Sequence, residues 1–105
     1  MKLYQAFSEP GFHTTISTTF SLDFPAYEQI ALKRLRDAGC MNNILIADGR
    51  MVTHALDDAE RAPLYAGRHY SVVGADTSKL FHPKVTLQLG TESARLLVAS
   101  AILIV

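Results

Sequence analysis

The chain has 105 residues, of which 49% are hydrophobic and 19% are charged, and this composition excludes an intrinsically disordered protein. A chain of this length holds one domain, so residues 1–105 are expected to fold as a single unit with its own core. Ten acidic and ten basic residues cancel, which excludes the strongly basic charge typical of many nucleic-acid-binding domains.

The first predicted elements are a strand and a long helix. Residues 12–22 are rich in threonine and β-branched residues and poor in charge, which favours a strand. A helix follows, with Pro25 in its first turn, Glu28 near the positive end of its dipole and Gly39 closing it. The apolar face of this helix, at three- and four-residue spacing, consists of Tyr27, Ile30, Ala31, Leu35 and Ala38.

The middle of the chain predicts two short strands with a short helix between them. The apolar run 43–47 has the pattern of a buried strand, and residues 48–49 read as the turn that ends it. Thr53 is the expected cap of a short acidic helix that stops near Pro63. A second short strand is predicted at 70–74.

The last third predicts two longer strands, over 80–89 and from Arg95 onward, joined by a turn at 90–93. The element order is then strand, helix, strand, short helix and three strands. This order predicts an α/β domain with a mixed β-sheet flanked by helices.

The strand over 80–89 alternates between polar and apolar residues. One side holds His82, Lys84, Thr86 and Gln88, and the other holds Val85, Leu87 and Leu89. We therefore expect the apolar side to face the core and the opposite side to carry the histidine and the lysine. An imidazole beside a fixed ammonium is suited to attacking and holding a phosphate.

The length of the turn decides which residues lie opposite one another in this hairpin. A turn with three central residues would pair Gly90 with Ala94, and hence Lys84 with Ser100. A loop of two or four residues would move Ser100 to the other face. We expect the three-residue turn, which gathers His82, Lys84 and Ser100 into one cluster.

These residues resemble the signature of a known superfamily. His82-Pro83-Lys84, followed by the strand Ala-Arg-Leu-Leu-Val-Ala-Ser-Ala at 94–101, is similar to the His-x-Lys and (Gly/Ala)-Ser-x-Asn halves of a phospholipase D-like domain. That superfamily includes metal-independent nucleases and phosphodiesterases. The resemblance covers most of the chain and implies the fold of the N-terminal part of such a domain.

The resemblance implies a role for each residue of the cluster. In the superfamily the signature histidine attacks phosphorus and becomes a covalent phosphohistidine, so His82 is the implied nucleophile. Lys84 is the implied clamp on the non-bridging oxygens, and Ser100 the implied hydrogen-bond donor. No metal or cofactor is implied. A second signature histidine protonates the leaving group, so a chain with one signature requires a homodimer that brings two copies of His82 together.

Three departures from the superfamily pattern support an alternative. Leu89 stands where the signature has an acidic residue, Ile102 stands where it has an asparagine, and the sequence stops at Val105. The alternative is a non-catalytic interaction or structural module that self-associates through its apolar C-terminal strand, residues 101–105. A shortened relative whose remaining half still folds is a third reading.

The single cysteine, the apolar C-terminal run and the histidine spacing predict the location and the ligands of the protein. A single cysteine, Cys40, excludes an internal disulfide and fits a reducing compartment, and no signal peptide is visible. The apolar run 96–105 is too short to span a bilayer, so a cytoplasmic protein without a membrane partner is expected. DNA, RNA, phospholipid and small phosphodiesters all stay open as substrates. The other histidines, His13, His54 and His69, lack the spacing of a zinc site.

Overall fold

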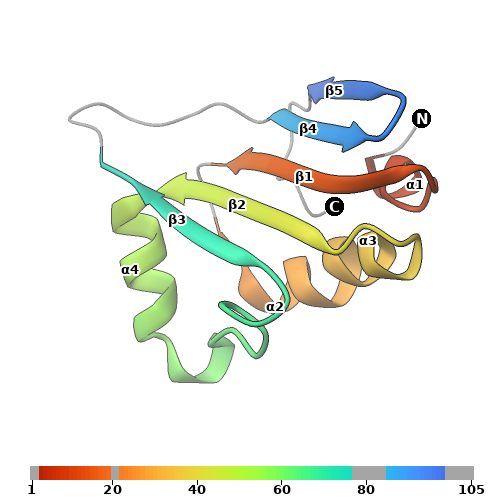
Figure 1. Ribbon diagram of the computed structural model, residues 1–105. Coiled ribbons are helices and arrows are strands. Elements are labelled where there is room, and N and C mark those ends of the chain that lie inside the picture. The colour runs from red at the N-terminus through yellow and green to blue at the C-terminus, as the bar shows by residue number, and fades with distance from the viewer. Residues whose placement is uncertain (1–2, 20–21, 77–84, 99–105) are drawn as a thin grey trace.

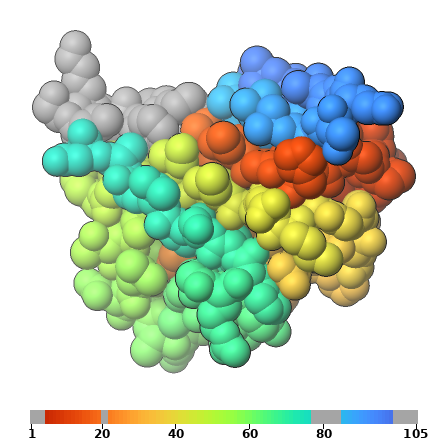
Figure 2. Space-filling view, viewed as in Figure 1, coloured from red at the N-terminus to blue at the C-terminus, as the bar shows by residue number. Residues whose placement is uncertain are grey.

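A computed structural model of the chain describes residues 3–19, 22–76 and 85–98. It contains one mixed five-stranded sheet with helices packed beneath it (Figure 1), which confirms the predicted fold class. The strands are β1 (Phe12–Thr19), β2 (Asn42–Asp48), β3 (Ser71–Ala75), β4 (Val85–Gly90) and β5 (Ala94–Val98). In space they follow the order β3-β2-β1-β4-β5, which Figure 2 shows from turquoise to blue.

The first strand, β1, is the centre of the sheet. It runs parallel to β2 on one side and antiparallel to β4 on the other. Beyond these, β3 pairs parallel with β2, and β5 pairs antiparallel with β4. The carboxyl ends of β1, β2 and β3 and the amino end of β4 therefore lie at the same edge of the sheet.

The helical segments lie on one side of the sheet in Figure 1. They are α1 (Leu3–Phe7), α2 (Phe24–Ala26), the π-helical η1 (Tyr27–Leu32), α3 (Lys33–Asp37), α4 (Gly49–Asp57) and the 3₁₀ turn η2 (Ala59–Arg61). Among the described residues, no helix combines the length and the apolar character needed to cross a bilayer.

The predicted long helix is confirmed as the continuous run α2-η1-α3. Asp23 caps its start by accepting a hydrogen bond of 3.2 Å from the Ala26 backbone N–H, and Gly39 follows its end with φ of +94°. The expected apolar face is wrong in one position, because Ile30 is 38% exposed while Leu32 is buried. Ile30 lies beside the buried stripe rather than within it.

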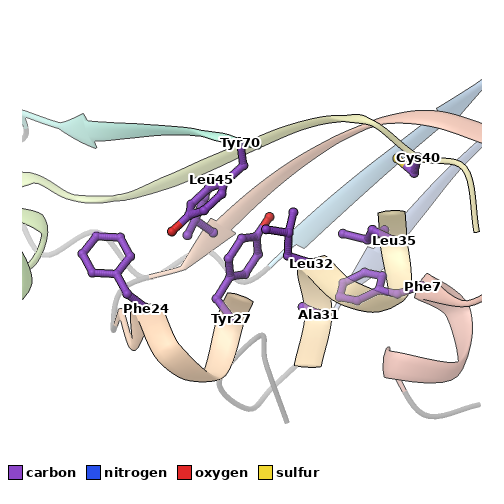
Figure 3. Packing of buried hydrophobic residues seen from close by; sticks show 9 residues of the cluster. All are labelled: Phe7, Phe24, Tyr27, Ala31, Leu32, Leu35, Cys40, Leu45 and Tyr70. Atoms are coloured by element: carbon purple, nitrogen blue, oxygen red, sulfur yellow. The ribbon is translucent and has the colours of Figure 1, made fainter. Parts of the chain in front are cut away.

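The main apolar core lies between these helices and the sheet (Figure 3). Its buried members are Phe7, Phe24, Tyr27, Ala31, Leu32, Leu35, Cys40, Leu45 and Tyr70. The rings of Tyr27 and Tyr70 lie 4.9 Å apart between centroids, at an interplanar angle of 54°. Each large side chain buried here contributes roughly 1.5–3 kcal/mol of transfer free energy. Burial also raises the pKa of the Cys40 thiol, as expected for a packing residue.

The segment after β2 differs from the prediction. Residues 48–49 do not form a turn, because α4 begins at Gly49 with Asp48 as its N-cap. The predicted cap, Thr53, instead lies inside this helix and donates a hydrogen bond of 3.0 Å to the Gly49 carbonyl oxygen. The carboxylate of Asp48, the last residue of β2, satisfies free N–H groups of the helix about one turn earlier than expected.

The two faces of the sheet also differ from the prediction. In β4, the polar residues Thr86 and Gln88 are each only 1% exposed and lie on the side covered by helices, whereas the apolar side chains lie on the other side. Buried polar partners explain this inversion: Ser17 Oγ and Thr86 Oγ1 lie 3.1 Å apart, and Gln88 accepts from Arg95. The expected orientation of the alternating strand is therefore wrong over 85–89.

Candidate functional site at the carboxyl edge of the sheet

The three residues predicted to form the site, His82, Lys84 and Ser100, lie outside the described residues. The strand that follows the first two, β4, is described from Val85. Its first residue lies beside the end of β1, where the Val85 backbone N–H donates a hydrogen bond of 3.2 Å to Thr18 Oγ1. The predicted motif thus directly precedes a strand that starts at the carboxyl edge of the parallel strands.

The hairpin of β4 and β5 has a different register from the one expected. Leu89, rather than Gly90, is the partner of Ala94, so four residues separate the paired positions instead of three. The turn is closed by a hydrogen bond of 2.7 Å from the Gly90 N–H to the Ser93 carbonyl oxygen. The pairing of Lys84 with Ser100 was derived from the three-residue turn, so its basis is wrong.

Close packing at Gly90 accompanies this register. A Cβ atom at residue 90 would collide with the carbonyl oxygen of Gly11, just before β1. Gly90 is the residue of β4 that pairs with Phe12 at the start of β1, next to an irregularity in the ladder between Phe12 and Thr14. The approach of two backbone segments, rather than turn propensity alone, therefore constrains the end of β4.

A surface cavity of about 640 Å³ opens beside the carboxyl ends of β2 and β3. Its lining residues are Asp48, Gly49, Arg50, Thr53, His54, Asp57, Gly74, Ala75 and Asp76. Two glycines let α4 begin close to β3: a Cβ at Gly74 would lie 3.1 Å from the Gly49 Cα, and one at Gly49 would lie 3.2 Å from the Ala75 oxygen.

Asp48 is the most constrained group of this cavity. Its side chain is 2% exposed, and its Oδ1 accepts hydrogen bonds from the backbone N–H groups of Arg50 and Met51, at 3.0 and 3.3 Å. The Arg50 guanidinium also contacts both carboxylate oxygens, at 3.3 Å each. The Arg50 side-chain hydrogen bond is the main cause that lowers the pKa of Asp48, so the group is a charged cap.

The charges of this cavity do not by themselves favour a phosphate. Arg50 is engaged with Asp48, and the other acidic residues, Asp57 and Asp76, oppose an anion. His54 is the second side chain of the cavity able to carry positive charge. The cavity can form one wall of a site at this edge, while a cation from outside the lining is needed to hold an anion.

The remaining histidines are dispersed. His13, at the opposite edge of the sheet near the start of β1, is exposed, and its Nδ1 lies 2.7 Å from Thr14 Oγ1. His69 stacks on Tyr65 with ring centroids 4.7 Å apart and an interplanar angle of 2°. In residues 3–19, 22–76 and 85–98, no three His, Cys, Asp or Glu side chains are grouped as metal ligands.

Two polar centres were not predicted. Glu28 is buried and accepts hydrogen bonds from segment 64–70, instead of facing the helix dipole. Arg95 contacts Gln88, Glu9 and the backbone of α1. Both depend on contacts across long stretches of sequence, so local spacing holds no signal for them. The cap role of Asp48 does have a local signal, because an aspartate there precedes apolar residues at helical spacing.

Comparison with known proteins adds no relative: no protein-family model, curated protein or solved structure matches the chain.

Proposed function

We propose that this chain is a phospholipase D-like domain related to nucleases and phosphodiesterases, acting without a metal through His82. The observation that supports the proposal is the position of the motif in the sequence: His82-Pro83-Lys84 directly precedes the first described residue of β4, which begins at the carboxyl edge of a mixed α/β sheet. Ligand sites in α/β proteins favour the ends of strands at this edge.

The proposed chemistry is displacement at phosphorus in two steps. A ring nitrogen of His82 attacks the phosphodiester, the bond from phosphorus to the leaving oxygen breaks, and a second histidine gives that oxygen its proton. Water then attacks the phosphohistidine, the phosphorus–nitrogen bond breaks, and the second histidine takes the water proton. Lys84 holds the non-bridging oxygens, because phosphoryl transfer depends on positioning and charge stabilisation.

The second histidine is His82 of another copy, so the proposed enzyme is a homodimer. Ser100 is the proposed hydrogen-bond donor to the phosphate, although its role no longer follows from the hairpin register. We place the protein in the cytoplasm as part of the same proposal, because Cys40 is a buried free thiol that fits a reducing compartment.

Hydrolysis in the presence of a chelator tests the proposal. Single-stranded DNA and a chromogenic phosphodiester are incubated with wild-type protein, His82→Ala and the matched control His13→Ala. Turnover that resists the chelator, is lost in His82→Ala and persists in His13→Ala supports the proposal. Turnover equal in all three proteins, or none in wild type, contradicts it.

A second candidate function is a non-catalytic interaction module. Leu89 stands where the superfamily signature has a carboxylate, and large apolar side chains are exposed on the two edge strands. Val73 of β3 is 46% exposed, and Val98 of β5 is 78% exposed. Absent turnover together with self-association would favour this candidate over the enzyme.

A further inference from the structure

The sheet has two unequal faces, and the more apolar one carries no described helix. Beneath the helices, the central strands bury polar groups, such as the Thr15 hydroxyl that donates a 2.7 Å hydrogen bond to Asn43 Oδ1. The opposite side of the sheet is called the open face. Its larger apolar residues are Ile16, Ile44, Ile46, Val73, Val85, Leu87, Leu89, Leu96 and Val98. Small or polar residues on the same side are Thr14, Thr18, Asn42, Ser71, Ala75 and Ala94.

The side chains of the open face form continuous rows across the strands. Ile44 lies opposite Ile16, Ile16 opposite Leu87, and Leu87 opposite Leu96, so one apolar row crosses four adjacent strands. At the β5 end of this row, Leu96 is 61% exposed. A contiguous apolar surface of this kind marks an interaction site on a folded protein.

Charge restricts the kind of partner that fits. The open-face residues named above are uncharged, and Asp48, which pairs with Ala75 at the end of β2, has its buried carboxylate held by the start of α4. Arg95, the charged residue of β5, lies on the helix-covered side and contacts Gln88. A nucleic acid or a charged peptide would find no complementary group here. The surface that matches it best is another uncharged, apolar sheet face.

We propose that the open face is covered by the open face of a second copy of this chain. Two sheets pack face to face at a separation of about 10 Å with their strands inclined by about 30°. A two-fold axis makes such a contact self-complementary, because a residue i that contacts residue j of the partner has its own copy contacted by residue j in return. The dimer is then a two-sheet core with a layer of helices on each outer side.

The flat area of the open face comes close to the area that a homodimer interface buries. Five strands at about 4.8 Å spacing and about 20 Å length give a flat area of roughly 500 Å² per copy, before the relief of the side chains is counted. Stable interfaces bury about 600–1,000 Å² of accessible surface per partner, and those of homodimers are the more apolar ones. The proposal is independent of phosphodiester chemistry, so a dimer without turnover still supports it.

A tryptophan reporter tests which molecule covers the face. The chain has no tryptophan, so Leu96→Trp introduces a single fluorophore on the open face. Its emission is expected to shift to the blue as protein concentration rises through the dissociation constant of the dimer. The control Leu56→Trp, on α4, is expected to keep an emission independent of concentration. Red emission at residue 96 that stays constant with concentration overturns the proposal, and so does constant blue emission in a protein that light scattering shows to be monomeric.

Light scattering after size exclusion tests the same surface by substitution. Leu96→Lys and Val73→Lys each place a charge on the open face, once per copy, and are expected to raise the dissociation constant at least about 100-fold. Leu56→Lys changes an exposed apolar residue outside the face and is expected to leave it unchanged. Circular dichroism verifies folding. A monomeric wild type overturns the proposal, and so does an unchanged dissociation constant in both folded variants. If both variants misfold, the Leu96→Trp emission is the deciding measurement.

Discussion

Tyr70 donates a hydrogen bond of 2.8 Å to Glu28 Oε2, although the two residues are 42 positions apart in the sequence. The same carboxyl group accepts from the backbone N–H groups of Leu64 and Tyr65, at distances of 2.9–3.1 Å. Glu28 thereby fixes the segment between η2 and β3 onto the long helix. Burial, followed by the hydrogen bond to Glu28, raises the pKa of the Tyr70 phenol, so the hydroxyl stays a donor.

Replacing Glu28 with glutamine is expected to destabilise the fold. The amide has one acceptor oxygen, and its NH₂ group would face backbone N–H groups that also need acceptors. The free energy of unfolding is expected to fall by about 1–3 kcal/mol, measured by urea denaturation. The neighbouring exposed Gln29→Ala serves as the control and is expected to change it by less than about 0.5 kcal/mol. An unchanged stability in Glu28→Gln would contradict the role assigned to this carboxyl group.

The pair Asp23 and Arg61 is expected to make stability depend on acid pH. Hydrogen bonds of 2.6 and 2.7 Å from the Arg61 guanidinium lower the pKa of Asp23 below its usual 3.8. Because the folded pKa is the lower one, this stabilisation is present above about pH 4 and is lost as the pH falls through the folded value. Both side chains are partly exposed, so the effect is small and weakens in salt.

The variant Asp23→Asn isolates this contribution, because asparagine keeps the helix cap and removes the charge. Its melting temperature is expected to fall less steeply than that of wild type between about pH 4 and pH 2. Arg61→Gln, and the double variant, are expected to show the same shallower slope. Equal slopes in wild type and Asp23→Asn would exclude this pair as a source of acid sensitivity.

Gly90→Ala is expected to destabilise the hairpin through a steric conflict. The added methyl group would meet the Gly11 carbonyl oxygen, which is backbone and has little room to move. A loss of about 1–3 kcal/mol in the free energy of unfolding is expected. Thr91→Ala, in the same turn but exposed, is the matched control. Equal stabilities of the two variants would mean that the backbones at residues 11 and 90 lie farther apart.

Arg95→Lys is expected to loosen α1 while keeping the charge. The guanidinium donates to Gln88 Oε1 at 2.8 and 2.9 Å, to Glu9 Oε2 at 2.8 Å and to the Ala6 carbonyl oxygen at 3.2 Å. A lysine lacks this planar fork. We expect a loss of about 1–2 kcal/mol and faster amide hydrogen exchange in α1, with exposed Arg68→Lys as the control. Unchanged exchange in α1 would show that the helix is held by its apolar contacts alone.

Local patterns were sufficient for most elements of the fold. Pro25 and Gly39 bracket the long helix, and the apolar runs at 43–47 and 70–74 became β2 and β3 within a residue or two. These signals act within one turn or one strand, so the sequence displays them directly. The cap role of Asp48 also depends on groups within one helical turn of it. An Asp-Gly pair is equally common in a turn, however, so the sequence alone does not distinguish the two roles.

Nonlocal contacts explain what the sequence did not predict. Thr86 and Gln88 are buried because Ser17 and Arg95 supply partners, and neither partner is visible from the alternation of one strand. The turn of the last hairpin depends on Gly11, 79 positions before Gly90 in the numbering. The candidate site depends on His82, Lys84 and Ser100, outside the described residues, so its roles stay predictions.

The position of β1 also has a consequence for biosynthesis. Ser17 of β1 contacts Thr86 of β4, which is translated 69 residues later. At typical elongation rates this interval is roughly 3–14 s, during which one edge of the central strand has no partner in its own chain. Nascent chains in that interval present a strand edge rich in threonine and β-branched residues, the kind of surface that chaperones protect from pairing with neighbouring chains.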